Sequence, residues 1–209
     1  MEEMQRLGVP RAPAVAVGDR VVHGWNPEGY AKLVGVAWMP PGKLSPRALA
    51  ARLDAILAAT EELTRAIPAA RLGWKPPERD RTLGDLAFHV FRIGASFPDA
   101  MDGDGLRESW FSEPAPPELA DGAAIARYGS LVRGRLTGWF EGTADTEFDR
   151  VVQTYYGPQA AHEFLERTTW HTAQHLRQLH VLFDRIGIEP SESLDPALLQ
   201  NLPLPESIW

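Results

Sequence analysis

Residues 168–180 read TTWHTAQHLRQLH and contain three of the six histidines of the chain. His171 and His175 stand four positions apart, so on a helix their side chains project from the same face, one turn from each other. Phe164 and Leu179 fall on that face as well, which indicates that it turns toward an apolar interior. The stretch therefore predicts an amphipathic helix whose histidine pair either holds a metal ion or fills a core.

Three more stretches carry helical periodicity. Ser45 followed by Pro46 is typical of a helix start, and Thr82 with Asp85 three residues later resembles a capping box. Pro98 is expected to end the second of these helices. The four predicted helices run from Pro46 to Pro68, from Thr82 to Pro98, from Asp121 to Phe140, and from near Pro158 to Gly187.

The lengths of the connections add a topological expectation. Residues 102–120 are too many for a tight antiparallel hairpin, so they favour a crossover between the second and third helices. Residues 142–157 contain EFDRVVQTYY, which predicts a short strand pair. The predicted fold is mainly α: a four-helix bundle with one long crossover and a small N-terminal β-hairpin–helix appendage.

The appendage comprises residues 1–38. PAVAVGDRVVHGW predicts two short strands around a Gly18-Asp19 turn, and NPEGYAKLVG predicts a short helix with Asn26 as its cap and Pro27 at its first position. Because an isolated hairpin is marginal in water, we expect this segment to pack on the bundle, on the C-terminal tail, or on a second copy in a homodimer. The remaining predicted segments are a linker at 39–45, the bundle at 46–190 and the tail at 191–209.

The composition limits the classes of binding partner to expect and the residue types that could bind a metal or act as a nucleophile. A net charge of −7, from 21 basic and 28 acidic residues, gives no reason to expect binding to nucleic acid or to an anionic membrane surface. No run of about 18 apolar residues is present, so we expect a soluble, cytoplasmic protein. Cysteine is absent, which excludes disulfides, thiolate ligands and a cysteine nucleophile. A metal would be held by His, Asp, Glu or water, and any thiol would come from outside.

A third histidine joins the pair. His89 lies on the inward stripe of the second predicted helix, so with His171 and His175 it makes three inward histidines on two helices. Buried imidazoles need partners for their ring nitrogens, and one divalent cation satisfies all three. Three histidines with an open position form a catalytic type of site rather than a closed structural one. The other histidines are predicted to be surface or packing residues: His23, His162 and His180.

Two stretches resemble the DinB-like family of metal-binding four-helix bundles. LGWKPPERDRTLGDLAFHV (72–90) is similar to the start of the family's second helix, and WHTAQHLRQLHVLFDRIGIEP (170–190) is similar to its fourth. The long link between the second and third predicted helices is also similar to that of the family. The resemblance covers roughly residues 44–190 and implies that His89, His171 and His175 are the metal ligands.

The family includes enzymes that depend on bacillithiol or mycothiol. The resemblance therefore implies one divalent metal ion that activates water or a low-molecular-weight thiol for transfer to a small electrophilic substrate, for its isomerisation or for its hydrolysis. Zn or Ni is the expected ion, with Fe or Cu as alternatives. Gln178, Tyr128 and Arg92 are candidates to bind the substrate, Asp85 is a further candidate, and no residue is assigned a catalytic role. Two other interpretations stay open: a non-catalytic metal-binding or stress-related module, and a bundle whose histidines are satisfied by neighbouring side chains.

The N-terminal segment carries a second resemblance. RAPAVAVGDRVVHGWNPEGYAKLVG (11–35) is similar to the C-terminal half of a glutaredoxin or thioredoxin-like domain, with Pro13 at the cis-proline position. The first strand and the Cys motif of such a domain are missing, so the resemblance implies no redox activity for this chain. It does suggest an ancestor that combined thiol handling with the metal-binding bundle.

Overall fold

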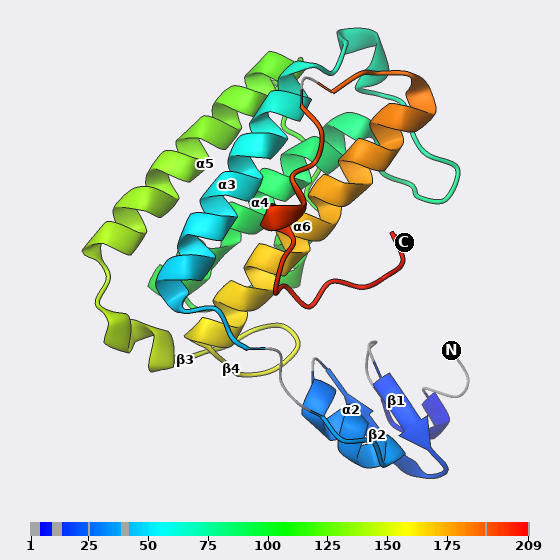
Figure 1. Ribbon diagram of the computed structural model, residues 1–209, viewed down its shortest axis with the longest axis vertical. Helices are drawn as coiled ribbons and strands as arrows, with labels where there is room; N and C mark the ends of the chain where they lie inside the picture. The colour runs from blue at the N-terminus through cyan, green and yellow to red at the C-terminus, as the bar shows by residue number, and fades with distance from the viewer. Residues whose placement is uncertain (1–4, 10–13, 25, 39–41, 191, 209) are drawn as a thin grey trace. The chain divides into compact units, whose positions relative to one another are not determined.

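The computed structural model of the 209-residue chain describes residues 5–9, 14–24, 26–38, 42–190 and 192–208. The chain divides into two compact units, residues 1–43 and residues 44–209 (Figure 1). The larger unit is built on four long helices, which confirms the predicted bundle: α3 (Pro46–Arg65), α4 (Leu83–Asp102), α5 (Gly122–Gly142) and α6 (Ala161–Ile186). Short 3-10 turns lie between and after them: η1 (Ala69–Arg71), η2 (Glu108–Phe111), η3 (Asp145–Asp149) and η4 (Pro196–Leu198).

The helix starts follow the local sequence. The side chains of Ser45, Thr82 and Asp121 accept hydrogen bonds from backbone N–H groups three residues later, at 3.2, 3.0 and 2.6 Å. Each cap satisfies an N–H that the first helical turn leaves without an intrahelical partner. Gly187 ends α6 with φ 69°, in the left-handed region that favours glycine.

The second helix extends beyond its predicted end, so the expectation that Pro98 closes it is wrong. α4 passes through Pro98 and ends at Asp102, although a proline inside a helix removes one backbone hydrogen bond. The last turn is held by contacts from α5, because Arg135 pairs with Asp99 at 2.5 Å and Trp139 Nε1 donates to Asp102 at 2.9 Å. These tertiary contacts outweigh the local signal for a helix end.

The fourth helix begins later than predicted, at Ala161 rather than near Pro158. The residues before it form β4 (Gln159–Ala160), which pairs antiparallel with β3 (Val151–Val152). The predicted strand in the stretch EFDRVVQTYY therefore exists, but its partner is the segment that was assigned to the start of the helix.

The packing order of the bundle differs from the chain order. α3 and α4 each pack against both α5 and α6, so the two consecutive helices α3 and α4 lie on a diagonal. The link between α4 and α5 runs back along α4, because the backbone N–H of Ala115 donates to Asp85 in its first turn at 2.9 Å. α5 therefore starts at the same end of the bundle as α4, which is the long crossover expected from the sequence.

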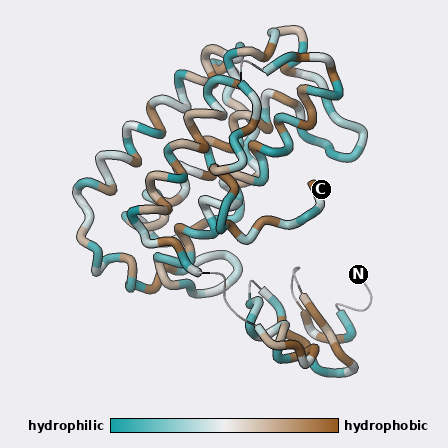
Figure 2. The backbone as a smooth tube through the Cα atoms, viewed as in Figure 1, coloured by the Kyte–Doolittle hydropathy of each residue, from teal (hydrophilic) through white to brown (hydrophobic). Residues whose placement is uncertain are grey.

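The core lies between these helices. Along each helix, polar and apolar residues alternate in step with the helical turns (Figure 2). Its largest fully buried side chains are phenylalanines on α4 and α6: Phe91, Phe97, Phe164 and Phe183. Gly129 lets α5 approach α4, because a Cβ atom at that position would lie 2.4 Å from Cε1 of Phe91. None of the helices in the described ranges is long and apolar enough to cross a membrane.

The smaller unit has the predicted hairpin and helix. β1 (Ala14–Val17) and β2 (Arg20–His23) pair antiparallel around Gly18, whose φ is 61°. α2 (Pro27–Val34) contacts both strands, and Asn26 Oδ1 accepts from the N–H of Gly29 at 2.8 Å. Pro13 and linker residues 39–41 lie outside the described residues. The likeness to a thioredoxin-like domain stays a prediction.

Candidate metal centre

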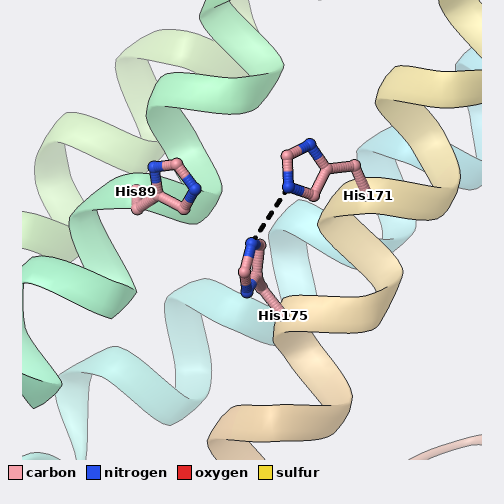
Figure 3. Close-up of side chains that lie close together, drawn as sticks. All are labelled: His89, His171 and His175. Atoms are coloured by element: carbon pink, nitrogen blue, oxygen red, sulfur yellow. Dashed lines mark hydrogen bonds between the residues drawn. The ribbon is translucent and has the colours of Figure 1, made fainter. Parts of the chain in front are cut away.

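Three histidines from two helices meet inside the bundle. His89 lies in the second turn of α4, and His171 and His175 lie on successive turns of α6, so that the three imidazoles come close together (Figure 3). Each offers one ring nitrogen, and the three nitrogens lie within 4.8 Å of one another. The Nε2 atoms of His171 and His175 are 3.1 Å apart. The structure thus brings together the three residues that the helix periodicity had placed inward.

Burial keeps these imidazoles neutral. His89 is 3% exposed, and burial lowers its pKa from 6.5 to about 2, with smaller contributions from His175, Arg81 and Arg92. Burial lowers the pKa of His175 to about 4 and that of His171 well below its usual range. A neutral imidazole has a free lone pair, which is the form that binds a metal ion. The group is therefore ready to bind a metal at neutral pH.

The hydrogen bonding of the group also fits a metal ion. Nδ1 of His89 is buried and has no hydrogen-bond partner within the part of the chain that the structure describes. Two neutral Nε2 atoms that face each other at 3.1 Å, as in His171 and His175, can share at most one proton. A cation among the three rings would engage their lone pairs together, and three imidazoles suit Zn, Ni, Fe or Cu.

Gln178 contacts the group directly. Its Oε1 atom lies 2.6 Å from Nδ1 of His175, on the side of the ring away from His171. Its Nε2 atom donates to the backbone carbonyl of Ile208 at 2.6 Å. The sequence had suggested Gln178 for substrate binding, and the structure places it as a hydrogen-bonding partner of a ligand histidine and of the C-terminal tail.

Tyr128 and Arg92, the other residues suggested for substrate binding, are engaged within the bundle. The ring of Tyr128 lies 5.3 Å from that of Phe88, and burial raises the pKa of its hydroxyl. Arg92 pairs with Asp99 at 3.0 Å and with Glu113 at 2.8 Å. Their role toward a substrate stays a prediction. Asp85 accepts hydrogen bonds at the start of α4, which gives it a structural task.

A different arginine lies beside the histidines. Arg81 Nη2 donates to the carbonyl of Phe111 at 2.7 Å, and the ring of Phe111 lies 5.9 Å from that of His89 and 5.6 Å from that of His171. Burial is the main cause of the lowered pKa of all three histidines, and the positive charge of Arg81 lowers the pKa of each of them further. Sequence reasoning missed Arg81 because it lies in the irregular segment before α4, where no periodicity assigns a direction.

The remaining histidines lie elsewhere. His162 Nε2 is 2.8 Å from the carbonyl of Leu44, His180 is half-buried outside the triad, and His23 is exposed in the smaller unit. A cavity of about 620 Å³ lies between the start of α3 and the end of α5, and none of the three grouped histidines lines it. Among the described residues, the possible metal ligands therefore group where α4 meets α6, away from this cavity.

Comparison with known proteins agrees with this arrangement. The model of the DinB superfamily matches residues 52–179, which is more than half of the chain and includes all three grouped histidines. The chain belongs to the DinB superfamily. A crystal structure of a DinB-like protein from Bacillus cereus matches with a TM-score of 0.55 and 16% identity, over 66% of this chain and 91% of that one. That likeness supports the fold of this DinB protein. The comparison with curated proteins found no match.

Proposed function

We propose that this DinB protein is a metal-dependent enzyme that activates water or a low-molecular-weight thiol for attack on a small electrophilic substrate. The observation that carries the proposal is the donor group itself. Within the described ranges it has three members, His89, His171 and His175. An ion with three protein ligands keeps a coordination position for water or a cosubstrate, whereas structural sites are closed by a fourth protein ligand.

The metal, when bound, would lower the pKa of a coordinated water or thiol so that it reacts at neutral pH. The residues around it supply the rest of the environment. The edge-on ring of Phe111 and the ring of Trp170, 5.8 Å from that of His171, form an apolar wall beside the histidines. Such a wall excludes water and strengthens electrostatic interactions near the reacting atoms.

Arg81 indicates which charge a substrate of this site would carry. The positive charge of Arg81 acts on all three histidines and interacts with Asp85, whereas Arg92 is paired directly with two carboxylates. Guanidinium groups bind carboxylates and phosphates in a planar, two-pronged geometry. An anionic electrophile, such as an unsaturated carboxylic acid, therefore suits this site better than a cationic or wholly apolar one.

Metal analysis of protein purified without a histidine tag tests the first step. One equivalent of Zn or Ni is expected in the wild-type chain and in His180→Ala, which serves as a control on the same helix outside the group. His171→Ala and His175→Ala are expected to lose the metal and keep most of their helix content. If both variants still bind one equivalent, the ligand assignment is wrong.

The second step separates catalysis from metal storage. Metal-loaded protein is incubated with bacillithiol or mycothiol and an unsaturated carboxylic acid, and the loss of free thiol is followed against His175→Ala. Faster thiol loss with the wild type supports the proposal. Stoichiometric metal without thiol consumption, isomerisation or hydrolysis would favour the alternative function, a non-catalytic metal-binding or stress-related module. Absence of metal binding would favour a bundle whose histidines are satisfied by neighbours.

A further inference from the structure

The C-terminal tail is held against α6 by its backbone. Gln174 Nε2 donates to the carbonyls of Ser207 and Ile208 at 3.1 and 2.9 Å, and Gln178 Nε2 donates to that of Ile208 at 2.6 Å. Arg177 Nη1 donates to the carbonyl of Pro205 at 2.8 Å. Three side chains of one helix therefore bind the peptide groups of residues 205–208. One of them, Gln178, also contacts a ligand histidine.

The direction of these hydrogen bonds fixes where the protons are. A carbonyl oxygen only accepts, so the amide NH₂ of Gln178 must face Ile208 and its Oε1 must face His175. Oε1 also only accepts, so Nδ1 of His175 carries the proton. Nε2 of the same ring is then left with its lone pair, and this is the atom that faces Nε2 of His171 at 3.1 Å. The arrangement selects the tautomer of His175 that binds a metal through Nε2.

Without Ile208 the selection would be lost. The side-chain amide of Gln178 could then turn over and present its NH₂ to Nδ1 of His175, which would favour the opposite tautomer. That tautomer carries a proton on Nε2, the atom whose lone pair would bind the metal. Partners of this kind, which hydrogen-bond to the second nitrogen of a ligand histidine, commonly change metal affinity by a factor of roughly 10–100 when removed.

We propose that the C-terminal tail is a working part of the metal centre: through Gln178, the carbonyl of Ile208 sets the tautomer of His175 and so the affinity for the metal. Gln178 acts in this scheme as a positioning residue and touches neither metal nor substrate. The proposal rests on the three-histidine metal site of the proposed function and is independent of whether that site is catalytic.

The test combines a tail truncation with substitutions at position 178. Removing residues 205–209 is expected to weaken Zn binding by roughly 10–100-fold, and Gln178→Leu by a similar factor, measured by competition with a chromophoric chelator. A carboxylate accepts from Nδ1 in either orientation, so in a Gln178→Glu background the truncation is expected to cost less than about threefold. Arg52→Ala is the control, because Arg52 holds the tail only at Leu198 and Gln200, at 3.1 and 2.8 Å.

Two results would overturn the proposal. One is unchanged Zn affinity in the truncated chain and in Gln178→Leu. The other is an equal loss on truncation with Gln and with Glu at position 178, which would show that the tail acts through general stability. Nitrogen-15 spectra of the imidazoles in the metal-free protein give an independent readout, with the proton of His175 expected on Nδ1 in the full chain. They separate the two failures: a proton on Nε2 of His175 in the full chain overturns this proposal whether or not metal binds, whereas absence of metal binding overturns the proposed function and, with it, the effect of the tail on affinity.

Discussion

Acid is expected to destabilise the metal-free protein well above the pH at which carboxylates titrate. The folded protein holds His89, His171 and His175 neutral, because burial lowers the pKa of His89 to about 2, that of His175 to about 4 and that of His171 well below its usual range. In the unfolded chain each titrates near a pKa of about 6.5. Below that pH the unfolded state binds more protons, so stability is present above about pH 6.5 and is lost as the pH falls toward the folded pKa values.

The size of the effect follows from the number of protons. Each histidine that is protonated only in the unfolded state makes the free energy of unfolding fall by about 1.4 kcal/mol per pH unit. Three such residues give an upper value of about 4 kcal/mol per pH unit below about pH 6. Between about pH 6.5 and about pH 5 the loss amounts to at most about 6 kcal/mol, so a metal-free bundle at the lower end of the usual stability of roughly 5–15 kcal/mol is expected to approach unfolding near about pH 5.

The assay is urea unfolding, followed by circular dichroism in the presence of a chelator, at intervals from about pH 7.5 to about pH 5, which stays above the ordinary carboxylate pKa values. His175→Gln is the matched variant, and its slope is expected to be lower by about 1.4 kcal/mol per pH unit. A wild-type slope of less than about 1.4 kcal/mol per pH unit would mean that fewer than one of these histidines is held neutral. An identical slope in His175→Gln would likewise refute the reasoning for that residue.

Three further outcomes are expected. Gly129→Ala places a Cβ atom 2.4 Å from Cε1 of Phe91 and is expected to lower stability by about 1–3 kcal/mol, whereas Gly134→Ala on the same helix, with open space around it, is expected to be neutral or stabilising in the same urea titration. Arg81→Gln is expected to weaken the binding of small carboxylates, measured by calorimetry, without changing metal content. The chain 39–209 is expected to keep the metal, because its histidines belong to the larger unit, and light scattering of both chains tests whether the smaller unit forms a homodimer.

Features that depend on short-range sequence could be predicted. The starts of α3, α4 and α5 follow from Ser45, Thr82 and Asp121, whose caps act within three residues of the chain. His89 and the pair on α6 were placed inward by helix periodicity alone, because a fixed rotation per residue determines which side chains share a face. Neither result required knowledge of how the helices pack.

Features that depend on distant contacts could not be predicted. The end of α4 beyond Pro98 depends on partners on α5, and local propensity gives no sign of them. Arg81 occupies an irregular segment, so no rotation rule assigns it to the histidines. The docking of the tail has the weakest signal of all, because the groups that α6 binds are backbone carbonyls, which every residue carries.

The spacing of residues along α6 explains why Gln178 connects the metal centre to the tail. Gln178 lies three positions after His175 and four after Gln174, so it is adjacent to both on the helix surface. Its amide then has two tasks, to accept from His175 and to donate to the carbonyl that also binds Gln174. A carboxylate performs only the first task and an ammonium group only the second. Position 178 therefore requires an amide of this length, and a shorter Gln178→Asn side chain is expected to lose one of the two contacts.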